Sequence, residues 1–495
     1  MLVLSSLLLG ALAAVGAAPT EDIVTNLPGY GELPFSMYSG FLSYTMSTGQ
    51  QVNTHYILTQ QMEGEYDEGK LIFWSNGGPG ASSMFGFMTE VGPFSLNADS
   101  LTTDEYLSTG IPTVFPNENS WSQLGDLLIF EAPSPVGFSY CGDDVSADGT
   151  SCGDWTDELA AENNLLALQA FYLKFPELKT KDLYLSGESY AGVYIPTMAR
   201  SIITNDPSIN LKGFAVGDAC TGTEVLCGSD GDFGPWWDLT FMYGHGQLST
   251  KTYDSIKSAC GGEDTLKHPL ANGGLSDACN AKLAEMDDEI GGYYEYALYD
   301  DCTYDNGLLK SAARPQHTLW RGNVEGALND YTCGGGEVME LYANVTEVRD
   351  ALHVSQDSFF FSGDDGIGFN YTLTERNLMP FYKDVAIGKY ADLGVRVMVY
   401  NGDTDPGINS FVAQNWTSSL GLEEISAWRP WTLDSCARMG GYVTRYEGDF
   451  SFLTIRGAGH MTPTYKPEAS FEMFRSWIMG EEWKKYEKGC EEPEL

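Results

Sequence analysis

Short apolar runs that alternate with helical patterns constrain the fold of this chain more than any other feature of its 495 residues. Turn residues bound each run, which is typical of a buried β-strand. Alternation of such strands with helices predicts an α/β domain with a mainly parallel central sheet. The runs are Leu71–Trp74, Leu127–Phe130, Leu183–Leu185, Phe214–Val216, Val395–Tyr400 and Phe452–Ile455.

One of the expected helices is marked at both ends. Thr156 has the residue type of an N-cap, and Asp157 and Glu158 follow in the first turn, where the helix dipole favours anions. Pro176 predicts the end of this helix. The apolar residues that recur between these signals at helical spacing are Leu165, Leu168, Phe171, Tyr172 and Phe175.

The composition of the chain changes between about Cys220 and Cys333. Gly, Asp, Tyr and Cys become more frequent there, and the buried-strand runs stop. We interpret this segment as a cap inserted into the α/β domain. The predicted organisation is a signal peptide over 1–18, a core over 19–220 and 336–480, a cap over 221–335 and a polar tail over 481–495.

The N-terminus and the cysteines both indicate the secretory pathway, with an extracellular, lysosomal or vacuolar destination. The first 18 residues are almost wholly apolar or small, although they lack the usual basic residues of a signal peptide. Ten cysteines, an even number, indicate disulfide bonds in such a chain. Cys141–Cys152 and Cys220–Cys227 are plausible local pairs, but the connectivity stays open. No two cysteines have zinc-site spacing, so neither a metal nor another cofactor is expected.

The charge of the chain excludes one large class of function. With 69 acidic and 27 basic residues, the formal net charge is −42, so the chain repels nucleic acid. The same balance suits a protein that works in acid, where protonated carboxyl groups repel one another less. No run of about twenty apolar residues follows the first 18, so no membrane span is expected. Three sequons mark candidate glycosylation sites at Asn344, Asn370 and Asn415.

The predicted strand at Leu183–Leu185 leads into the sequence Gly187-Glu-Ser-Tyr-Ala. A Gly-x-Ser-x-small sequence between a strand and a helix is typical of a nucleophile elbow, which would expose the hydroxyl of Ser189. Backbone amides at the start of the following helix, Tyr190 first, can face a developing oxyanion. Taken alone, the motif also fits a serine that caps a helix.

Three further loops that follow predicted strands fit the same chemistry. The glycines of Asn76-Gly-Gly-Pro-Gly allow backbone amides to turn toward a ligand. Asp405 is a candidate for the carboxylate that orients a catalytic histidine. Of six histidines, only His460 lies just past a buried strand in a Gly-rich loop. The chain order Ser189, Asp405, His460 is that of the α/β-hydrolase triad, so we predict these residues as a catalytic triad.

Together these motifs resemble those of the serine carboxypeptidase family, over nearly the whole chain after the first 18 residues. The resemblance implies an α/β-hydrolase fold with helices on both faces of the sheet and an inserted cap region. It implies hydrolysis of the C-terminal peptide bond of peptides and proteins at acidic pH through an acyl-enzyme, without a cofactor, and homodimers are common in the family. The matching motifs include Leu27-Pro-Gly, Asn76-Gly-Gly-Pro-Gly, Asn119-Ser-Trp, Gly137-Phe-Ser-Tyr, Gly187-Glu-Ser-Tyr-Ala-Gly, Tyr243-Gly-His-Gly, Gly402-Asp-Thr-Asp and Gly457-Ala-Gly-His.

The resemblance also assigns roles to residues that the motifs alone do not explain. It implies an oxyanion hole at the amides of Gly78 and Tyr190. The implied site for the substrate's C-terminal carboxylate comprises Asn76, Gly77, Glu90 and Glu188, framed by Trp74. Two ionised glutamates would repel a carboxylate, but protonated glutamates with raised pKa would donate hydrogen bonds to it. We therefore expect strong peptide binding in acid and weaker binding above neutral pH.

The chain departs from the family's pattern at several positions. Ala81 stands where the family usually has a cysteine after Gly-Pro-Gly, so the disulfide that anchors this loop in many members is expected to be absent. Asp218, after Gly217, stands where the family usually has asparagine, and Pro406 is an unusual neighbour of Asp405. None of these changes removes a predicted catalytic group.

Two alternative functions stay open. Some members of the family transfer acyl groups from sugar esters with the same triad, and a secreted esterase on this fold is the second alternative. Asn76, Glu90 and Glu188 favour the peptidase, because a peptide carboxylate needs them. Side-chain preference is open too: Trp236, Trp237 and the Tyr293-Tyr294 region suit either an apolar subsite or core packing.

Overall fold

The computed structural model describes residues 18–62, 64, 66, 69–146, 152–227, 234–269, 271–300, 332–363, 369–436, 438–488 and 490. All but the last residue of the predicted signal peptide, 1–18, lies outside the described residues, and so does Cys302. Within the described ranges, no helix has both the length and the apolar character that crossing a membrane requires.

Parallel strands form the centre of the main sheet, and all six strands predicted from the sequence are among them. Helices cover both faces, so these strands are buried along nearly their whole length. The strands are β4 (Lys70–Ser75), β7 (Asp126–Phe130), β10 (Asp182–Glu188), β11 (Leu211–Gly217), β13 (Arg396–Gly402) and β16 (Phe450–Ile455). They pair in the order β7-β4-β10-β11-β13-β16.

Antiparallel strands extend this centre at both edges, so the sheet as a whole is mixed. On the β7 side lie β3 (Gln51–Thr59), β2 (Gly31–Thr45) and β1 (Ile23–Leu27), and on the β16 side lie β15 (Met439–Tyr446) and β14 (Glu424–Thr432). The short strand β8 (Tyr140–Cys141) pairs with β3. Two small sheets join β5 (Phe94–Ser95) to β6 (Phe115–Pro116) and β9 (Asp154–Thr156) to β12 (Asn370–Thr372).

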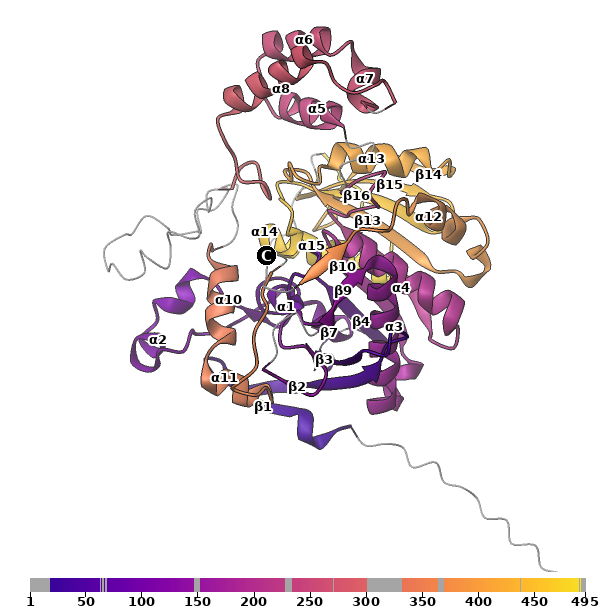
Figure 1. Cartoon of the computed structure of the whole chain (residues 1–495). Coiled ribbons are helices and arrows are strands. Elements are labelled where there is room, and N and C mark those ends of the chain that lie inside the picture. The colour runs from indigo at the N-terminus through magenta and orange to yellow at the C-terminus, as the bar shows by residue number, and fades with distance from the viewer. Residues whose placement is uncertain are drawn as a thin grey trace, which may run out of the picture.

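Side chains of the central strands alternate between two apolar cores, as the two-residue period of a strand requires. On β4, Leu71 and Phe73 join one core, and Ile72 and Trp74 join the other. The first core is covered by α3 (Asp157–Lys174), α4 (Ala191–Asn205), α12 (Met379–Ala386) and α13 (Ser410–Ser419). The second core is covered by α1 (Ser83–Thr89), α10 (Gly335–Ala343), α11 (Thr346–Ala351) and α15 (Pro467–Met479). The expected α/β architecture with helices on both faces is confirmed (Figure 1).

The helix expected after Thr156 is α3, and its start and end agree with the prediction. The hydroxyl of Thr156 accepts a hydrogen bond from the amide of Leu159 at 3.3 Å, as an N-cap does. The helix ends at Lys174, and Pro176 opens a short 3₁₀ helix.

Four helices gather apart from the sheet, at the top of the view in Figure 1. They are α5 (Pro235–Gly244), α6 (Thr250–Ala259), α7 (Glu263–Lys267) and α8 (Asp277–Ile290). They surround a small apolar core of their own, in which Trp236 is buried and against which Trp237 packs. The structure thus places both tryptophans in core packing.

The remaining α-helices of the described residues are α2 (Asp104–Thr109) and α14 (Thr462–Tyr465).

Four disulfide bonds lie in the described part of the chain, and they include both of the local pairs considered from the sequence. They are Cys141–Cys152, Cys220–Cys227, Cys260–Cys279 and Cys436–Cys490. Disulfides of this number are typical of an oxidising compartment.

Candidate active site

The residues predicted as catalytic follow the carboxyl ends of the parallel strands, where open α/β sheets bind their ligands. Ser189 follows β10, Asp405 follows β13 and His460 follows β16. The Gly-rich loop follows β4, which pairs directly with β10. The sheet therefore brings together segments that lie far apart in the sequence.

Ser189 sits at a sharp turn between β10 and α4. Its φ is 62°, a left-handed conformation that is uncommon for any residue other than glycine. The turn is held by hydrogen bonds from the Ser189 amide to Gly217 O, at 2.9 Å, and from the Gly192 amide to Ser189 O, at 2.9 Å. A side chain at Gly187 would come within 2.7 Å of the Ala191 Cβ, which explains the small residues at both ends of the motif.

The Gly-rich loop passes directly against this turn. A Cβ on Gly77 would lie 2.3 Å from the Tyr190 amide nitrogen and 2.7 Å from the Ser189 Cβ, so only glycine fits there. Among the described residues, the amides of Gly78 and Tyr190 donate to no other group. Two free amides next to a serine hydroxyl are the donors that an oxyanion hole needs.

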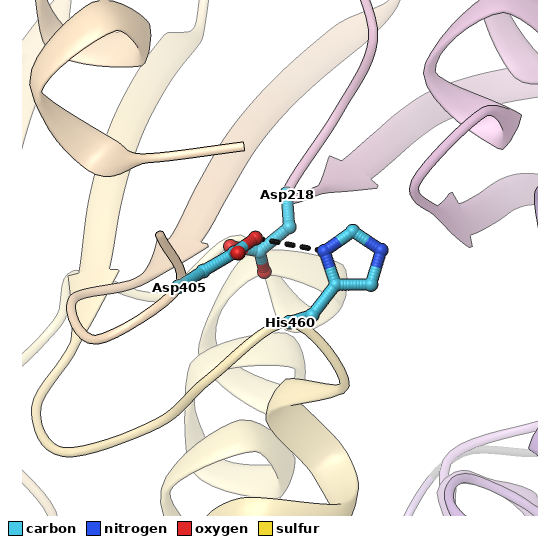
Figure 2. A group of neighbouring side chains, drawn as sticks. All are labelled: Asp218, Asp405 and His460. Atoms are coloured by element: carbon cyan, nitrogen blue, oxygen red, sulfur yellow. Dashed lines mark hydrogen bonds and ion pairs between the residues drawn. The ribbon is translucent and has the colours of Figure 1, made fainter. Parts of the chain in front are cut away.

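Asp405 and His460 form a buried hydrogen-bonded pair. His460 Nδ1 lies 2.7 Å from Asp405 Oδ2, and the two side chains are almost wholly buried (Figure 2). The other oxygen of Asp405, Oδ1, accepts hydrogen bonds from the amides of Gly407, at 2.8 Å, and Ile408, at 3.2 Å. An ionised carboxylate can only accept, so Nδ1 of His460 carries the hydrogen and Nε2 is left as the basic nitrogen.

Tyr296 fixes the other side of the histidine. Its carbonyl accepts the backbone amide of His460 at 2.7 Å, and its ring centre lies 4.9 Å from that of His460. No sequence pattern predicts this contact, because Tyr296 comes from the segment expected to form the cap. Neighbouring Tyr294 lines the cavity and also packs against the second apolar core, so both interpretations hold for it.

The side-chain amide of Asn76 is held from both ends. Its oxygen accepts hydrogen bonds from the indole of Trp74, at 2.9 Å, and from the amide of Gly86, at 3.1 Å. Its nitrogen donates to Glu90 and to Glu188, both at 3.1 Å. Trp74 itself is buried and does not line the site, so it acts by orienting Asn76.

Glu90 and Glu188 form a buried acid pair beside Asn76. Glu90 ends α1 and Glu188 ends β10, immediately before Ser189. Burial raises the pKa of Glu90 to about 7 and that of Glu188 well above its usual value. The two carboxyl groups accept from the same Asn76 amide nitrogen, and the charge of Glu90 further raises the pKa of Glu188. This pair is neutral or singly charged in acid, and doubly charged only at higher pH.

These groups surround one cavity of about 720 Å³. Its walls include Ser189, His460, Glu90, Glu188 and Asn76. Within the described residues Ser189 Oγ makes no hydrogen bond, and it lies on the cavity wall that it shares with His460. A ligand in the cavity can therefore reach the serine, the histidine and the acid pair together.

Asp218 is a site residue to which sequence reasoning gave no role. It follows β11, and its carboxyl group lies with the carboxyl group of Asp405 and the imidazole of His460 in a buried cluster, in which one polar atom from each side chain lies within 4.8 Å of the others. Carboxylates and imidazole at such distances are also metal ligands. Here Asp405 Oδ2 takes the hydrogen bond of His460 Nδ1, and the Asp218 carboxyl accepts hydrogen bonds from Asn401 and Gly402.

The family model described as serine carboxypeptidase matches residues 28–480. The chain belongs to the serine carboxypeptidase family. Among curated relatives of this serine carboxypeptidase, Serine carboxypeptidase 24 of Arabidopsis thaliana is 31% identical over 478 residues, which cover 93% of each chain. The lysosomal protective protein of Mus musculus is 31% identical over 488 residues, or 93% of this chain and 94% of that protein.

The fold of this serine carboxypeptidase is also found in a solved structure. Kex1(delta)p, a prohormone-processing carboxypeptidase from Saccharomyces cerevisiae, is 19% identical with a TM-score of 0.64, over 94% of this chain and 96% of that one. The expected α/β-hydrolase fold is therefore confirmed. Family membership makes the protein a hydrolase of the peptidase class.

Proposed function

We propose that this protein removes residues from the C-terminus of peptides and proteins in acid, through an acyl-enzyme on Ser189. The observation that carries the proposal is the buried acid pair Glu90–Glu188, which lines the same cavity as Ser189 and in which burial raises the pKa of both acids. A pair of this kind can bind a free carboxylate. Next to the bond that is cleaved, only the C-terminus of a peptide presents one. An esterase would not need it.

The proposed chemistry uses three side chains in turn. Ser189 Oγ attacks the carbonyl carbon of the last peptide bond, and His460 Nε2 takes the hydroxyl proton. Asp405 holds the imidazole in the required tautomer and stabilises it when charged. His460 then returns the proton to the leaving amine, and water cleaves the acyl-enzyme by the same route.

The amides of Gly78 and Tyr190 are proposed to stabilise the negative charge that develops on the carbonyl oxygen. Both are free to donate among the described residues, and the close approach of Gly77 to Tyr190 holds the two loops together. Glu131 holds the residues that follow the Gly-rich loop. It accepts hydrogen bonds from the Ser82 hydroxyl and the Met84 amide, both at 2.8 Å.

The substrate's terminal carboxylate is proposed to bind at Asn76, Gly77, Glu90 and Glu188. The Oε2 atom of each glutamate is buried and has no hydrogen-bond partner among the described residues, so each can carry a proton. Asn76 fixes the spacing of the pair by donating to both Oε1 atoms. A carboxylate of the substrate would then accept hydrogen bonds from protonated acids in a buried site.

We also propose passage through the secretory pathway, with a signal peptide at 1–18 and glycans on exposed sequons. Asn344, Asn370 and Asn415 are all exposed. The side-chain nitrogens of Asn344 and Asn370 donate to Glu340 O and Asp154 Oδ1, at 2.9 and 3.0 Å. Asn415 is therefore the most accessible acceptor, and enzymatic glycan removal followed by mass spectrometry tests this order.

We also propose a homodimer, because homodimers are common in the family, and light scattering tests this proposal.

One experiment tests the proposed activity directly. An N-blocked peptide is offered as free acid and as C-terminal amide at about pH 5, where a terminal carboxyl is ionised and Glu90 is protonated. We expect stepwise loss of residues from the free acid, little action on the amide, and none with Ser189→Ala. Equal cleavage of both peptides would remove the carboxylate-reading site from the proposal and favour an esterase.

A further inference from the structure

Asp218 is a buried acid that the mechanism above does not use. Its side chain is fully buried, and Figure 2 shows its carboxyl group beside that of Asp405, with a dashed line joining Asp405 to His460. The cluster lies behind the cavity wall, since neither aspartate lines the cavity. Any influence of Asp218 on a substrate must therefore pass through Asp405 and His460.

The backbone at Asp218 is held in an uncommon conformation. Its φ is 41°, in the left-handed region that is rare for residues other than glycine. The Asp218 amide donates to Tyr400 O at 2.8 Å, which ties the end of β11 to β13. Strained residues of this kind concentrate at functional sites.

The hydrogen bonds of the Asp218 carboxyl leave it facing another acid. Its Oδ1 accepts from the side chain of Asn401, at 3.1 Å, and from the amide of Gly402, at 3.0 Å. A carboxyl oxygen of Asp405 lies within 4.8 Å of one of Asp218. Two ionised carboxylates this close in a buried site repel each other, which favours a proton on one of them. Burial, and then the charge of Asp405, raises the pKa of Asp218 well above its usual value.

We propose that Asp218 is a positioning residue that holds the proton of this acid pair and, through it, keeps the Asp405 carboxylate in line with His460 Nδ1. In acid, the hydroxyl of Asp218 donates to Asp405, and Asp405 in turn accepts from His460 Nδ1. The proposal rests on the triad of the proposed function, but not on the nature of the substrate.

Loss of that proton changes the charges around the catalytic pair. The titratable groups that face Asp218 are Asp405, His460, Glu188 and Tyr400, the last two through their electrostatic interaction with it. Once Asp218 ionises, two adjacent anions repel each other and the hydrogen bond between them is lost. Asp405 then moves from its place beside His460, and Ser189 becomes less reactive as the pH rises.

The test uses a fluorophosphonate, which labels an activated serine and needs neither a peptide nor its carboxylate. Its second-order rate constant with full-length wild type and with Asp218→Asn is measured from about pH 5 to about pH 8. Asparagine retains the acceptor for Asn401 and Gly402 and donates to Asp405 at every pH. We expect the ratio of the Asp218→Asn rate constant to the wild-type one to rise about fivefold over this range.

A matched control is Asp238→Asn, in α5. Burial raises the pKa of Asp238 to about 7, but it lies among the helices apart from the sheet. The ratio of the Asp238→Asn rate constant to the wild-type one should not change with pH. Parallel profiles for wild type and Asp218→Asn, or the same rise with Asp238→Asn, would overturn the proposal.

Thermal melting gives a second readout. A raised native pKa makes the contribution of the Asp218 proton fully present below the unfolded value and lost as pH rises toward the native one. The Tm of Asp218→Asn minus that of wild type should therefore increase from acid to neutral pH, and a constant or decreasing difference contradicts the proposal. A variant that fails to fold contradicts it too, because the amide makes each contact assigned to the protonated acid. Labelling of Ser189 without peptide cleavage would refute the proposed substrate and leave this test intact.

Discussion

Two pairs of buried carboxyl groups lie in the same site and face in different directions. Glu90 and Glu188 line the cavity, whereas Asp218 and Asp405 lie behind His460, away from the cavity wall. In both pairs two buried acids lie close together, and burial raises the pKa of Glu90, Glu188 and Asp218. The pairs share their chemistry and differ in the group that each one contacts.

Because of this difference, we expect each pair to affect a different kinetic constant. A pair that touches the ligand's carboxylate changes substrate binding, and so mainly KM. A pair that touches the histidine changes the reactivity of Ser189, and so mainly kcat. Acid favours both, because one proton per pair removes the repulsion between its members.

The largest expected effect comes from the inner pair. Asp405→Asn should reduce kcat by about 10⁴-fold with little change in KM, because the wrong histidine tautomer faces Ser189. Steady-state kinetics on a free-acid peptide at about pH 5 measures both constants. Ser189→Ala gives the background rate of the assay. If Asp405→Asn changed KM instead of kcat, the two pairs would not differ in the way proposed.

The outer pair should give the opposite pattern. Glu188→Ala removes one proton donor for the substrate carboxylate and leaves Glu90 beside it, so KM should rise about 30-fold, or ~2 kcal/mol. The loss applies to a free-acid peptide and not to its amide, which has no carboxylate to bind. If both peptides lost activity equally, Glu188 would act on catalysis rather than on recognition.

The pH dependence of KM sharpens the comparison further. Burial raises the pKa of Glu90 to about 7, so Glu90 ionises as the pH passes neutral and its negative charge then repels the substrate carboxylate. We expect KM for the free-acid peptide to rise about tenfold between about pH 6 and about pH 8, and Glu90→Gln to reduce this rise. Asp238→Asn, whose native acid has a similar raised pKa outside the site, should keep the wild-type profile. A flat wild-type profile contradicts the role of the pair.

The sequence predicted the strands and the triad because each has a local signal. Ser189, Asp405 and His460 each follow an apolar run, and the run predicts both the strand and the edge of the sheet where its last residue lies. The edge strands carry no such run. Only the last two residues of strand β14, for example, are buried, so its side chains do not form a continuous apolar segment.

Contacts between neighbouring strands could not be predicted in this way. Asp218 meets Asp405 because β11 pairs with β13, and the register sets Gly217 opposite Tyr400, far along the chain. The sequence showed Asp218 only as a departure from the family's usual asparagine. Glu90 carries no motif of its own and was found through the family resemblance alone. Both became interpretable once the sheet order set their partners.

The smallest effect on activity is expected at Asp157, a buried acid with no second acid beside it. Its Oδ1 accepts the hydroxyls of Tyr190 and Tyr371, at 2.6 and 2.8 Å, and its Oδ2 accepts the amides of Thr374 and Glu375, both at 2.6 Å. Asp157→Asn replaces one carboxylate oxygen with an NH₂ group, which cannot accept the hydrogen bonds that this oxygen receives. We expect the substitution to lower the free energy of unfolding by about 2 kcal/mol.

Because Tyr190 supplies one of the proposed oxyanion amides, kcat of Asp157→Asn should fall about threefold, far less than with Asp405→Asn. Chemical denaturation and steady-state kinetics measure the two effects. A carboxylate satisfied by hydroxyls and amides needs no shared proton, so the loss of stability should vary little between about pH 5 and about pH 8. A strong pH dependence here would mean that burial alone, rather than the pairing of two acids, makes this site sensitive to acid.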